Sequence, residues 1–365
     1  MHSHGPTPAF RALPAAMSSS SEDSQEFRFM VMTFNIGLQQ KQIDTILQME
    51  ARSAQNPKEV DKVAKLRRTL SAMLLLLQTY SPDVMVVQEV GGHEEGLRPE
   101  DVQHFERFLK TMWTISDGQK LAEDVFAEYE MHANMSYLCW TSRSRVQVLG
   151  TRVCDLVQNI PEQRWRVAQV VNALVRPLPT GFGSAHTRPP PPPSARHVRI
   201  VNMHLVSGQK DHSSGHNHSL NFRTRLECLA NATREAVDES SGFKPRASLV
   251  AGDFNIDSDV VLHTQFGHAL EERHAWCICD QDSFKDFILS TGASVERTIP
   301  LSLWTQADEG RYKVGGHMPI AMTFLWDSVL LPPLPKLTEM PAPLVRRALR
   351  LVNEAKKQVR HGNMC

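Results

Sequence analysis

The apolar run Ala247-Ser248-Leu249-Val250-Ala251 leads directly into Gly252-Asp253-Phe254-Asn255. An apolar run of this length, bounded by a glycine, predicts a short buried strand. Because side chains alternate along a strand, Asp253 and Asn255 are expected to face the same way where the strand ends. A carboxylate beside an amide can hold and polarise a water molecule. The alternative interpretation is a pair of side chains that only caps a turn.

Apolar runs and helical patterns alternate along the rest of the chain. Amphipathic helices are predicted over 57–80, where Asn56-Pro57 is a typical helix start, and over 220–237, while a polar helical pattern covers 91–130. The alternation predicts an α/β protein with at least one mixed sheet, and such sheets bind ligands where strands end. Strands are predicted over 27–34, 84–87, 137–140, 146–149, 165–175, 198–203, 249–251, 287–289 and 320–326. Polar residues of the kind found in active sites stand at strand ends: Asn35, Glu89, His204, Asp253, Asn255 and His317.

The composition is that of a folded protein with a large core, since the 365 residues are 41% hydrophobic and 22% charged. Lys and Arg together number 40, as do Asp and Glu. No overall basic field would therefore attract the chain to nucleic acid or to an anionic membrane. The six cysteines are scattered, which predicts reduced thiols in a reducing compartment. Cys277-x-Cys279 lacks the four ligands of a structural zinc site.

Several segments flank or interrupt the predicted domain, which spans 27–326. Residues 1–25 are rich in Ser, Pro, Ala and His and are expected to be disordered. The segment 177–196 contains five consecutive prolines at 189–193 and is expected to form an extended surface loop. Residues 327–343 resemble a Pro-rich linker. Residues 344–365 predict a basic helix and tail, which would pack by its apolar face or, alternatively, contact a membrane surface or a phosphate backbone.

No run approaches the roughly 20 apolar residues that a membrane-spanning helix needs, and the N-terminus lacks the apolar core of a signal peptide. We therefore expect an intracellular, cytoplasmic protein, and a monomer. His212, His216 and His218 lie in a Ser-, Gly- and Asn-rich stretch with spacing that suits a transition metal. A mobile polar loop near the active site is the simpler interpretation.

Five short motifs occur in a recognisable order, and together they resemble the endonuclease/exonuclease/phosphatase (DNase I-like) superfamily. The motifs are Thr33-Phe34-Asn35, Val87-Gln88-Glu89, Val201-Asn202-Met203-His204-Leu205, Gly252-Asp253-Phe254-Asn255 and His317-Met318-Pro319-Ile320. The resemblance extends from residue 27 to about residue 326. It implies a four-layer fold in which two packed mixed β-sheets are flanked by helices.

The resemblance also implies a metal site, with Mg²⁺ as the cofactor and Mn²⁺ as an alternative. Glu89 would be the principal metal ligand, and Asn35 would lie beside the metal and orient it or its water. Asp253 would orient or deprotonate the attacking water, and Asn255 would position that water and the phosphate. Mg²⁺ prefers carboxylate and water oxygens, which agrees with these residue types.

Two histidines would act on the phosphate in this interpretation. His204 would contact the scissile phosphate, and His317 would stabilise charge on the phosphoryl oxygens. The resemblance pairs this second histidine with an upstream aspartate. Asp286, in Lys285-Asp286-Phe287-Ile288-Leu289, fits that motif, with Asp280 and Asp282 as nearby alternatives.

One position departs from the family pattern. Members usually carry Ser-Asp before the C-terminal histidine, whereas this chain has Gly315-Gly316 before His317. The leading hypothesis is a Mg²⁺-dependent phosphodiesterase acting on RNA or DNA. One alternative is a lipid or small-molecule phosphoesterase, like a sphingomyelinase or an inositol phosphatase. The other, motivated by Gly316, is a catalytically weakened binding protein of the same fold.

Overall fold

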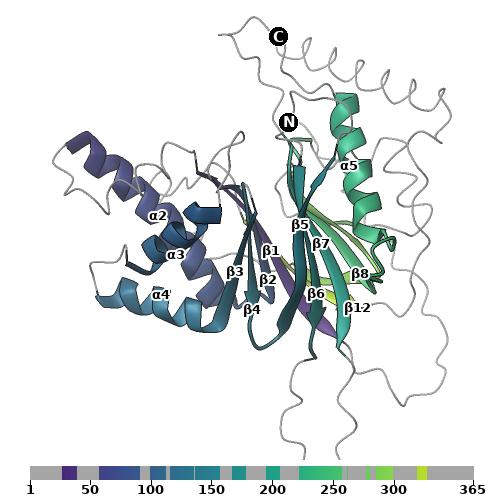
Figure 1. Ribbon diagram of the computed structural model, residues 1–365, viewed down its shortest axis with the longest axis horizontal. Coiled ribbons are helices and arrows are strands. Elements are labelled where there is room, and N and C mark those ends of the chain that lie inside the picture. The colour runs from purple at the N-terminus through teal and green to yellow at the C-terminus, as the bar shows by residue number, and fades with distance from the viewer. Residues whose placement is uncertain are drawn as a thin grey trace, which may run out of the picture.

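Two six-stranded mixed β-sheets pack face to face, and helices cover their outer faces (Figure 1). The computed structural model describes residues 27–38, 57–90, 99–111, 116–134, 136–156, 167–177, 195–205, 222–256, 261, 277–279, 285–298 and 319–326. Within these ranges the layers run helix, sheet, sheet, helix. The predicted fold class, two packed mixed sheets flanked by helices in four layers, is confirmed.

The first sheet has the strand order β11-β12-β1-β2-β4-β3, and the second has the order β5-β6-β7-β8-β10-β9. In the first sheet the strands are β11 (Ala293–Thr298), β12 (Ile320–Trp326), β1 (Arg28–Leu38), β2 (Val84–Val90), β4 (Tyr137–Ser142) and β3 (Tyr129–Asn134). In the second they are β5 (Val146–Asp155), β6 (Val167–Val175), β7 (Arg196–His204), β8 (Ala247–Asp253), β10 (Asp286–Thr291) and β9 (Cys277–Cys279).

Each sheet contains one parallel pair at its centre, and each pair is joined by a helix. β1 and β2 are parallel and connected through α2 (Pro57–Tyr80), whereas β7 and β8 are parallel and connected through α5 (Phe222–Val237). Parallel neighbours need such a crossover because the chain must return to the starting end of the sheet before the second strand can begin. The sequence therefore builds the same β-α-β unit twice, once in each sheet, and the other strand pairs are antiparallel.

Apolar side chains fill all three spaces between the layers. α2, α3 (Pro99–Thr111) and α4 (Ser116–Glu128) pack on the first sheet, where Phe126 meets Trp140 edge-on with ring centroids 5.3 Å apart. Between the sheets lies a second core, in which Phe29 stacks on Phe324 at 5.5 Å. The third core joins the second sheet to α5. Among the described residues, no helix is long and apolar enough to cross a membrane.

A buried arginine anchors the end of α5. Arg199 lies on the outer face of β7 and is fully buried. Its guanidinium donates to the carbonyl oxygens of Glu235 (2.9 Å) and Asp238 at the C-terminal end of the helix, and to Asn172 Oδ1 (2.8 Å). Helix C-termini leave carbonyl oxygens without intrahelical partners, and a cation there is favourable. This contact fixes α5 relative to β7.

Most predicted elements are present, and three strands were missed. α2 runs from Pro57 to Tyr80 as predicted. The helical pattern assigned up to residue 130 is wrong at its end, because β3 begins at Tyr129, whose buried hydroxyl donates to the Pro82 carbonyl. β9 and β11 are short strands that the apolar pattern does not reveal. The segments 1–25 and 327–365, together with 178–194 and His212, His216 and His218, lie outside the described residues.

Gly252 is required where β7 and β8 approach each other. Its φ is +148°, and a Cβ built on it would lie 1.8 Å from the carbonyl oxygen of Met203. We expect Gly252→Ala to destabilise the protein by about 3 kcal/mol or more, since both the backbone conformation and the adjacent strand must change. Urea unfolding measures the loss.

Gly150 in β5 provides the matched control, because a Cβ there would meet no atom within 4 Å. Gly150→Ala should change the free energy of unfolding by less than about 0.5 kcal/mol, as is usual at open surface positions. Equal effects of the two substitutions would show that the close approach at Gly252 is not limiting.

Candidate active site

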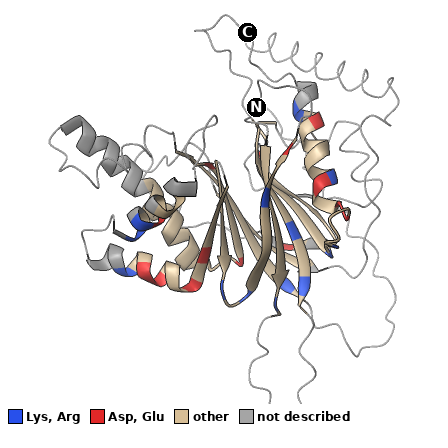
Figure 2. Cartoon of the chain, viewed as in Figure 1, with Lys and Arg blue, Asp and Glu red and all other residues tan. Residues whose placement is uncertain are grey.

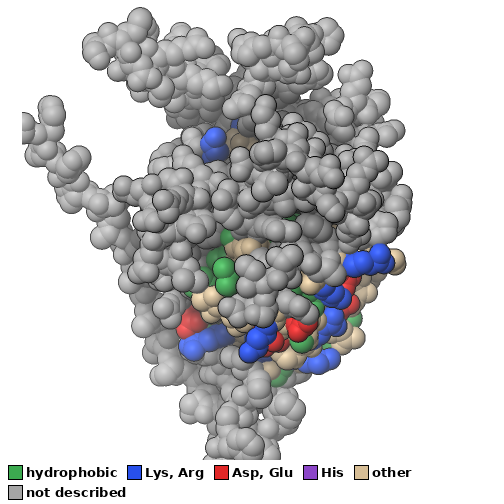
Figure 3. All heavy atoms as spheres, turned by 90° about the vertical axis from the view of Figure 1, so that its left-hand side faces the viewer, with side chains coloured by type: hydrophobic (Ala, Val, Ile, Leu, Met, Phe, Trp, Pro, Cys, Tyr) green, Lys and Arg blue, Asp and Glu red, His purple; other side chains and the backbone are tan. Residues whose placement is uncertain are grey.

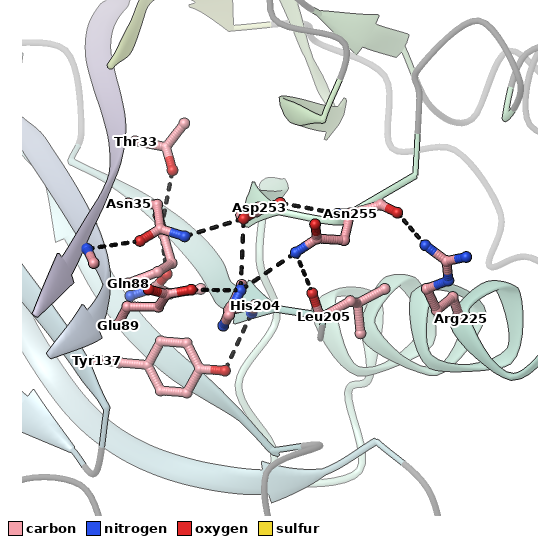
Figure 4. Close-up of polar contacts among 12 residues, drawn as sticks. Thr33, Asn35, Gln88, Glu89, Tyr137, His204, Leu205, Arg225, Asp253 and Asn255 are labelled. Carbon is pink, nitrogen blue, oxygen red and sulfur yellow. Dashed lines mark hydrogen bonds and ion pairs between the residues drawn. The ribbon is translucent and has the colours of Figure 1, made fainter. Parts of the chain in front are cut away.

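Four polar side chains from the ends of the four central strands meet where the two sheets face each other (Figure 4). His204 Nε2 at the end of β7 lies 3.0 Å from Glu89 Oε1 near the end of β2, and 3.5 Å from Asp253 Oδ2 at the end of β8. Asn35 Nδ2, from β1, donates to the same Asp253 oxygen at 3.0 Å. The carboxyl ends of both parallel pairs therefore contribute to one cluster.

The orientation of Glu89 depends on a local irregularity in the backbone of β2. Its φ is +57°, a left-handed conformation that is uncommon for a residue other than glycine. The pairing of β1 with β2 shifts register at this point, where Gly37 also has a positive φ of 58°. Residues held in such conformations concentrate at functional sites, where the surrounding structure enforces them. Here the irregularity coincides with the predicted metal ligand.

Asn35 is fixed at both ends of its amide. Its Oδ1 accepts a hydrogen bond from the Gly37 backbone N–H at 3.0 Å, and its Nδ2 donates to Asp253. The side chain is fully buried. Asn35 thus links the bulged end of β1 to the carboxylate of the opposite sheet.

Asn255 reaches the cluster by a turn and not by strand alternation. β8 ends at Asp253, and Asn255 has a left-handed φ of 47°. The Asn255 backbone N–H donates to Asp253 Oδ1 at 2.9 Å, an aspartate-initiated turn. Asn255 Nδ2 then lies 3.4 Å from His204 Nε2. The expectation that the two residues converge is confirmed, but its stated cause, alternation along a continuing strand, is wrong.

The predicted partner aspartate, Asp286, lies next to Asp253. It is buried and stands opposite Asp253 in the antiparallel pairing of β10 with β8. Stacking of Phe254 on Phe287, with ring centroids 3.9 Å apart, ties these two strand ends together. His317 lies outside the described residues, as do Gly316, Asp280 and Asp282, so the pairing of Asp286 with His317 stays a prediction.

His204 is a buried cation held by two carboxylates. Burial alone would lower its pKa, but hydrogen bonds to Asp253 and Glu89 outweigh burial and raise the pKa to about 9. At neutral pH the imidazole is therefore protonated and can donate to an anion. Its charge also stabilises the Asp253 carboxylate, which is buried and needs a partner, beside the partly exposed Glu89.

The donor atoms of Glu89, His204 and Asp253 all lie within 4.8 Å of one another, close enough for three ligands of one metal ion. Two carboxylates suit Mg²⁺ or Mn²⁺, and the imidazole would add a ligand only after losing its proton. The sequence-based assignment placed Glu89 and Asn35 at the metal and did not include His204 or Asp253 among its ligands. The chemistry of this donor set fits a divalent cation.

Several residues that support the site were not predicted. Gln88, Asn202 and Tyr137 are buried and contact the backbone or side chains beside the cluster. Arg225, in the first turn of α5, donates from Nη1 to the Asn255 carbonyl oxygen. The only signal available in the sequence is that Gln88 and Asn202 are amides within otherwise apolar strands.

No protein-family model and no curated protein sequence matches this chain. Among solved structures, an endonuclease/exonuclease/phosphatase family protein from Bacteroides thetaiotaomicron is 14% identical, with a TM-score of 0.48 over 84% of this chain and 100% of that one. D. rerio TDP2 complexed with a single-strand DNA product is 16% identical (TM-score 0.43; 83% and 99% covered). The human Nocturnin catalytic domain with bound sulfate is 14% identical (TM-score 0.45; 83% and 98% covered). At these identities the similarity is one of fold alone.

The raised pKa of His204 predicts how stability depends on pH in the metal-free protein. The folded-state pKa of about 9 exceeds the unfolded value of 6.5, so the stabilisation is fully present below pH 6.5. It is lost as the pH rises through about 9. We expect the free energy of unfolding to fall by roughly 3 kcal/mol over this range.

Urea titrations in EDTA between pH 6 and 10 measure this fall, with two histidine variants as comparisons. His204→Asn should remove this contribution and flatten the fall between pH 6.5 and 9. His197→Asn should retain it, because His197 lies at the opposite end of β7 with an exposed side chain. An imidazole resonance of His204 that titrates near pH 6.5 would contradict the assignment.

Proposed function

We propose that this protein is a Mg²⁺-dependent hydrolase of phosphoester bonds, and that it acts as a phosphodiesterase through in-line attack of water. The observation that carries the proposal is the convergence of Glu89, His204, Asp253 and Asn255 from both sheets on one point (Figure 4). Phosphoryl transfer needs a positioned water and neutralisation of oxygen charge, with little covalent chemistry from the protein. The cluster offers groups for both tasks.

Glu89 would be the principal ligand of the metal, with Asn35 beside it. When bound, a divalent cation supplies positive charge to the phosphoryl oxygens and polarises them. A carboxylate oxygen of Asp253 lies within 4.8 Å of the Glu89 donor atom, close enough to approach the same ion, whereas the protonated His204 would face the phosphate.

Asp253 is suited to hold the attacking water. Its two oxygens are oriented by Asn35 Nδ2, by His204 Nε2 and by the Asn255 backbone N–H. The carboxylate therefore has a fixed direction, and no reorganisation is needed when it accepts a proton from water. Fixed donors and acceptors of this kind supply much of the catalytic effect in water-excluded sites.

His204, as an imidazolium, would donate to a non-bridging phosphate oxygen while Asn255 Nδ2 orients the same group. His317, oriented by Asp286, would stabilise charge from the other side. Both roles fit the requirement for charge stabilisation that increases in the transition state. The Asp286–His317 part rests on the motif alone.

The substrate we favour is a nucleic acid, with lipid and small-molecule phosphoesters as the alternative. On the described surface, acidic and basic side chains intermix over α4 and α5 (Figure 2) and over the coloured part of the face that Figure 3 shows. No extended field of one sign is present there, so charge over these residues does not separate the candidates. Activity on RNA or DNA that falls steeply with salt would indicate a polymer substrate.

Conservative substitutions in the cluster test the enzyme assignment. We expect Glu89→Gln and Asp253→Asn each to lower kcat/KM by about a thousandfold or more, since each removes a charge that acts in the transition state. The assay uses single-stranded RNA, single-stranded DNA, sphingomyelin, inositol phosphates and bis(4-nitrophenyl) phosphate, with MgCl₂ or MnCl₂ and with EDTA as the blank.

Glu130→Gln provides the control, because Glu130 lies on β3 with a side chain that is 52% exposed. It should leave kcat/KM unchanged. Full activity of Glu89→Gln would show that the site is misplaced. A folded wild-type protein that hydrolyses none of these substrates would instead favour the binding-protein alternative.

The missing family acid at Gly316 makes a separate prediction. Gly316→Asp should restore a carboxylate near the metal and lower the Mg²⁺ concentration for half-maximal activity by about tenfold, the scale of effects around metal sites. Gly315→Asp is the matched control and should have no such effect. If neither substitution changes the Mg²⁺ dependence, Gly316 does not weaken the metal site.

A further inference from the structure

The space between the two sheets changes from apolar to polar immediately below the active site. Val31, Val86, Val171 and Ile200 form a fully buried apolar layer. One step closer to the site along the same strands, the inward-facing residues are polar and equally buried: Thr33, Gln88, Gln169 and Asn202. Buried amides cost free energy unless all of their groups are paired, and apolar residues would fill this layer without that cost. The layer therefore calls for an explanation beyond packing.

Asn202 extends from the second sheet into the first. Its Nδ2 lies 3.1 Å from the Val87 carbonyl oxygen and 3.2 Å from the Leu138 carbonyl oxygen. Val87 and Leu138 form the last residue pair between β2 and β4. Beyond them β2 turns into the left-handed conformation of Glu89. Asn202 thus satisfies backbone acceptors of the first sheet where the pairing of β2 with β4 ends, two residues before Glu89.

Gln88 holds Asn202 in this orientation. Its Nε2 donates to Asn202 Oδ1 at 2.7 Å and to Thr33 Oγ1 at 3.0 Å. Both amides are fully buried. Since Asn202 Nδ2 faces carbonyl oxygens and its Oδ1 faces a donor, the amide orientation is determined by its neighbours.

Tyr137 makes the reverse connection, from the first sheet to the second. Its hydroxyl donates to the Val167 carbonyl oxygen at 2.7 Å and accepts a hydrogen bond from the His204 backbone N–H at 3.1 Å (Figure 4). Burial raises the pKa of Tyr137, so the hydroxyl stays protonated and can make both bonds at once. His204 is therefore fixed by its own amide to a residue of the opposite sheet.

We propose that Tyr137 and Asn202 form a reciprocal clasp that sets the distance between Glu89 and His204. Each arm starts in one sheet and ends on the backbone of the other, at or beside a residue of the active site. This role depends on the proposed function, because the clasp would position the metal ligand Glu89 relative to the phosphate-binding His204. Tyr137 and Asn202 are positioning residues and contact neither metal nor substrate in this proposal.

Two tyrosine substitutions test the clasp against a purely structural role. Tyr137→Phe removes only the hydroxyl. Tyr129→Phe is the matched control, since Tyr129 is equally buried (2% exposed against 3%) and its hydroxyl donates to the Pro82 carbonyl at 3.0 Å, away from the site. We expect both variants to lose similar stability, seen as equal shifts of the urea midpoint.

Only Tyr137→Phe should affect the site. We expect a loss of about tenfold in kcat/KM, mainly in kcat, and in the affinity for Mn²⁺ measured by electron paramagnetic resonance, because small misplacements of reacting groups are costly. Tyr129→Phe should stay within about twofold of the wild type in both measurements. Asn202→Leu should act like Tyr137→Phe if it folds. Equal effects of the two tyrosine variants on kcat/KM or on Mn²⁺ binding would overturn the clasp.

A third measurement separates failure of the clasp from failure of the proposed function. In the metal-free protein, the Nε2–H proton of His204 should give a resolved, downfield resonance because it is hydrogen-bonded to Glu89. If the wild type neither turns over a phosphoester nor binds Mn²⁺, the proposed function fails and the clasp is judged on this resonance. Its loss in Tyr137→Phe but not in Tyr129→Phe supports the clasp, and its persistence in both overturns it.

Discussion

The contact of one buried imidazolium with two carboxylates connects everything else in this site. His204 belongs to the second sheet and Glu89 to the first, and their side chains meet at 3.0 Å. Burying a charge is costly unless it is paired, so this contact is stable only while the two sheets keep their relative position. In turn, the apolar core between the sheets maintains that position along the rest of the strands. Packing and electrostatics therefore depend on each other at this end of the molecule.

The fold brings the required side chains together by using one arrangement twice. Each sheet has a central parallel pair joined by a helix, and each pair ends in two polar residues: Asn35 and Glu89 in the first sheet, His204 and Asp253 in the second. A single sheet would present its strand ends in a row. Two sheets packed face to face present them across a seam, so a ligand between them can be contacted from both sides.

Local irregularity is the cost of this arrangement. Glu89 and Asn255 both adopt left-handed backbone conformations. Glu89 lies just beyond the last β2–β4 pair, and Asn255 follows the end of β8. The freed backbone groups are satisfied by side chains, as when Asp253 accepts from the Asn255 N–H and Asn202 approaches the Val87 carbonyl. These side-chain contacts therefore hold in place the two left-handed segments that carry Glu89 and Asn255.

The sequence by itself determined the apolar strands, the start of α2 at Pro57, and the identity of the residues at the strand ends, because these depend on local patterns of burial and capping. Only the tertiary structure decided that Asn35 would contact Asp253, 218 positions away in the chain, and that His204 would lie between two acids. The strands β3 and β11 and the left-handed turn at Asn255 were also beyond local patterns, since their form depends on strand pairing and on contacts with distant residues. Asp253 shows both parts: its place at the end of a buried strand was readable from Gly252-Asp253-Phe254-Asn255, whereas its partners were set by how two sheets pack.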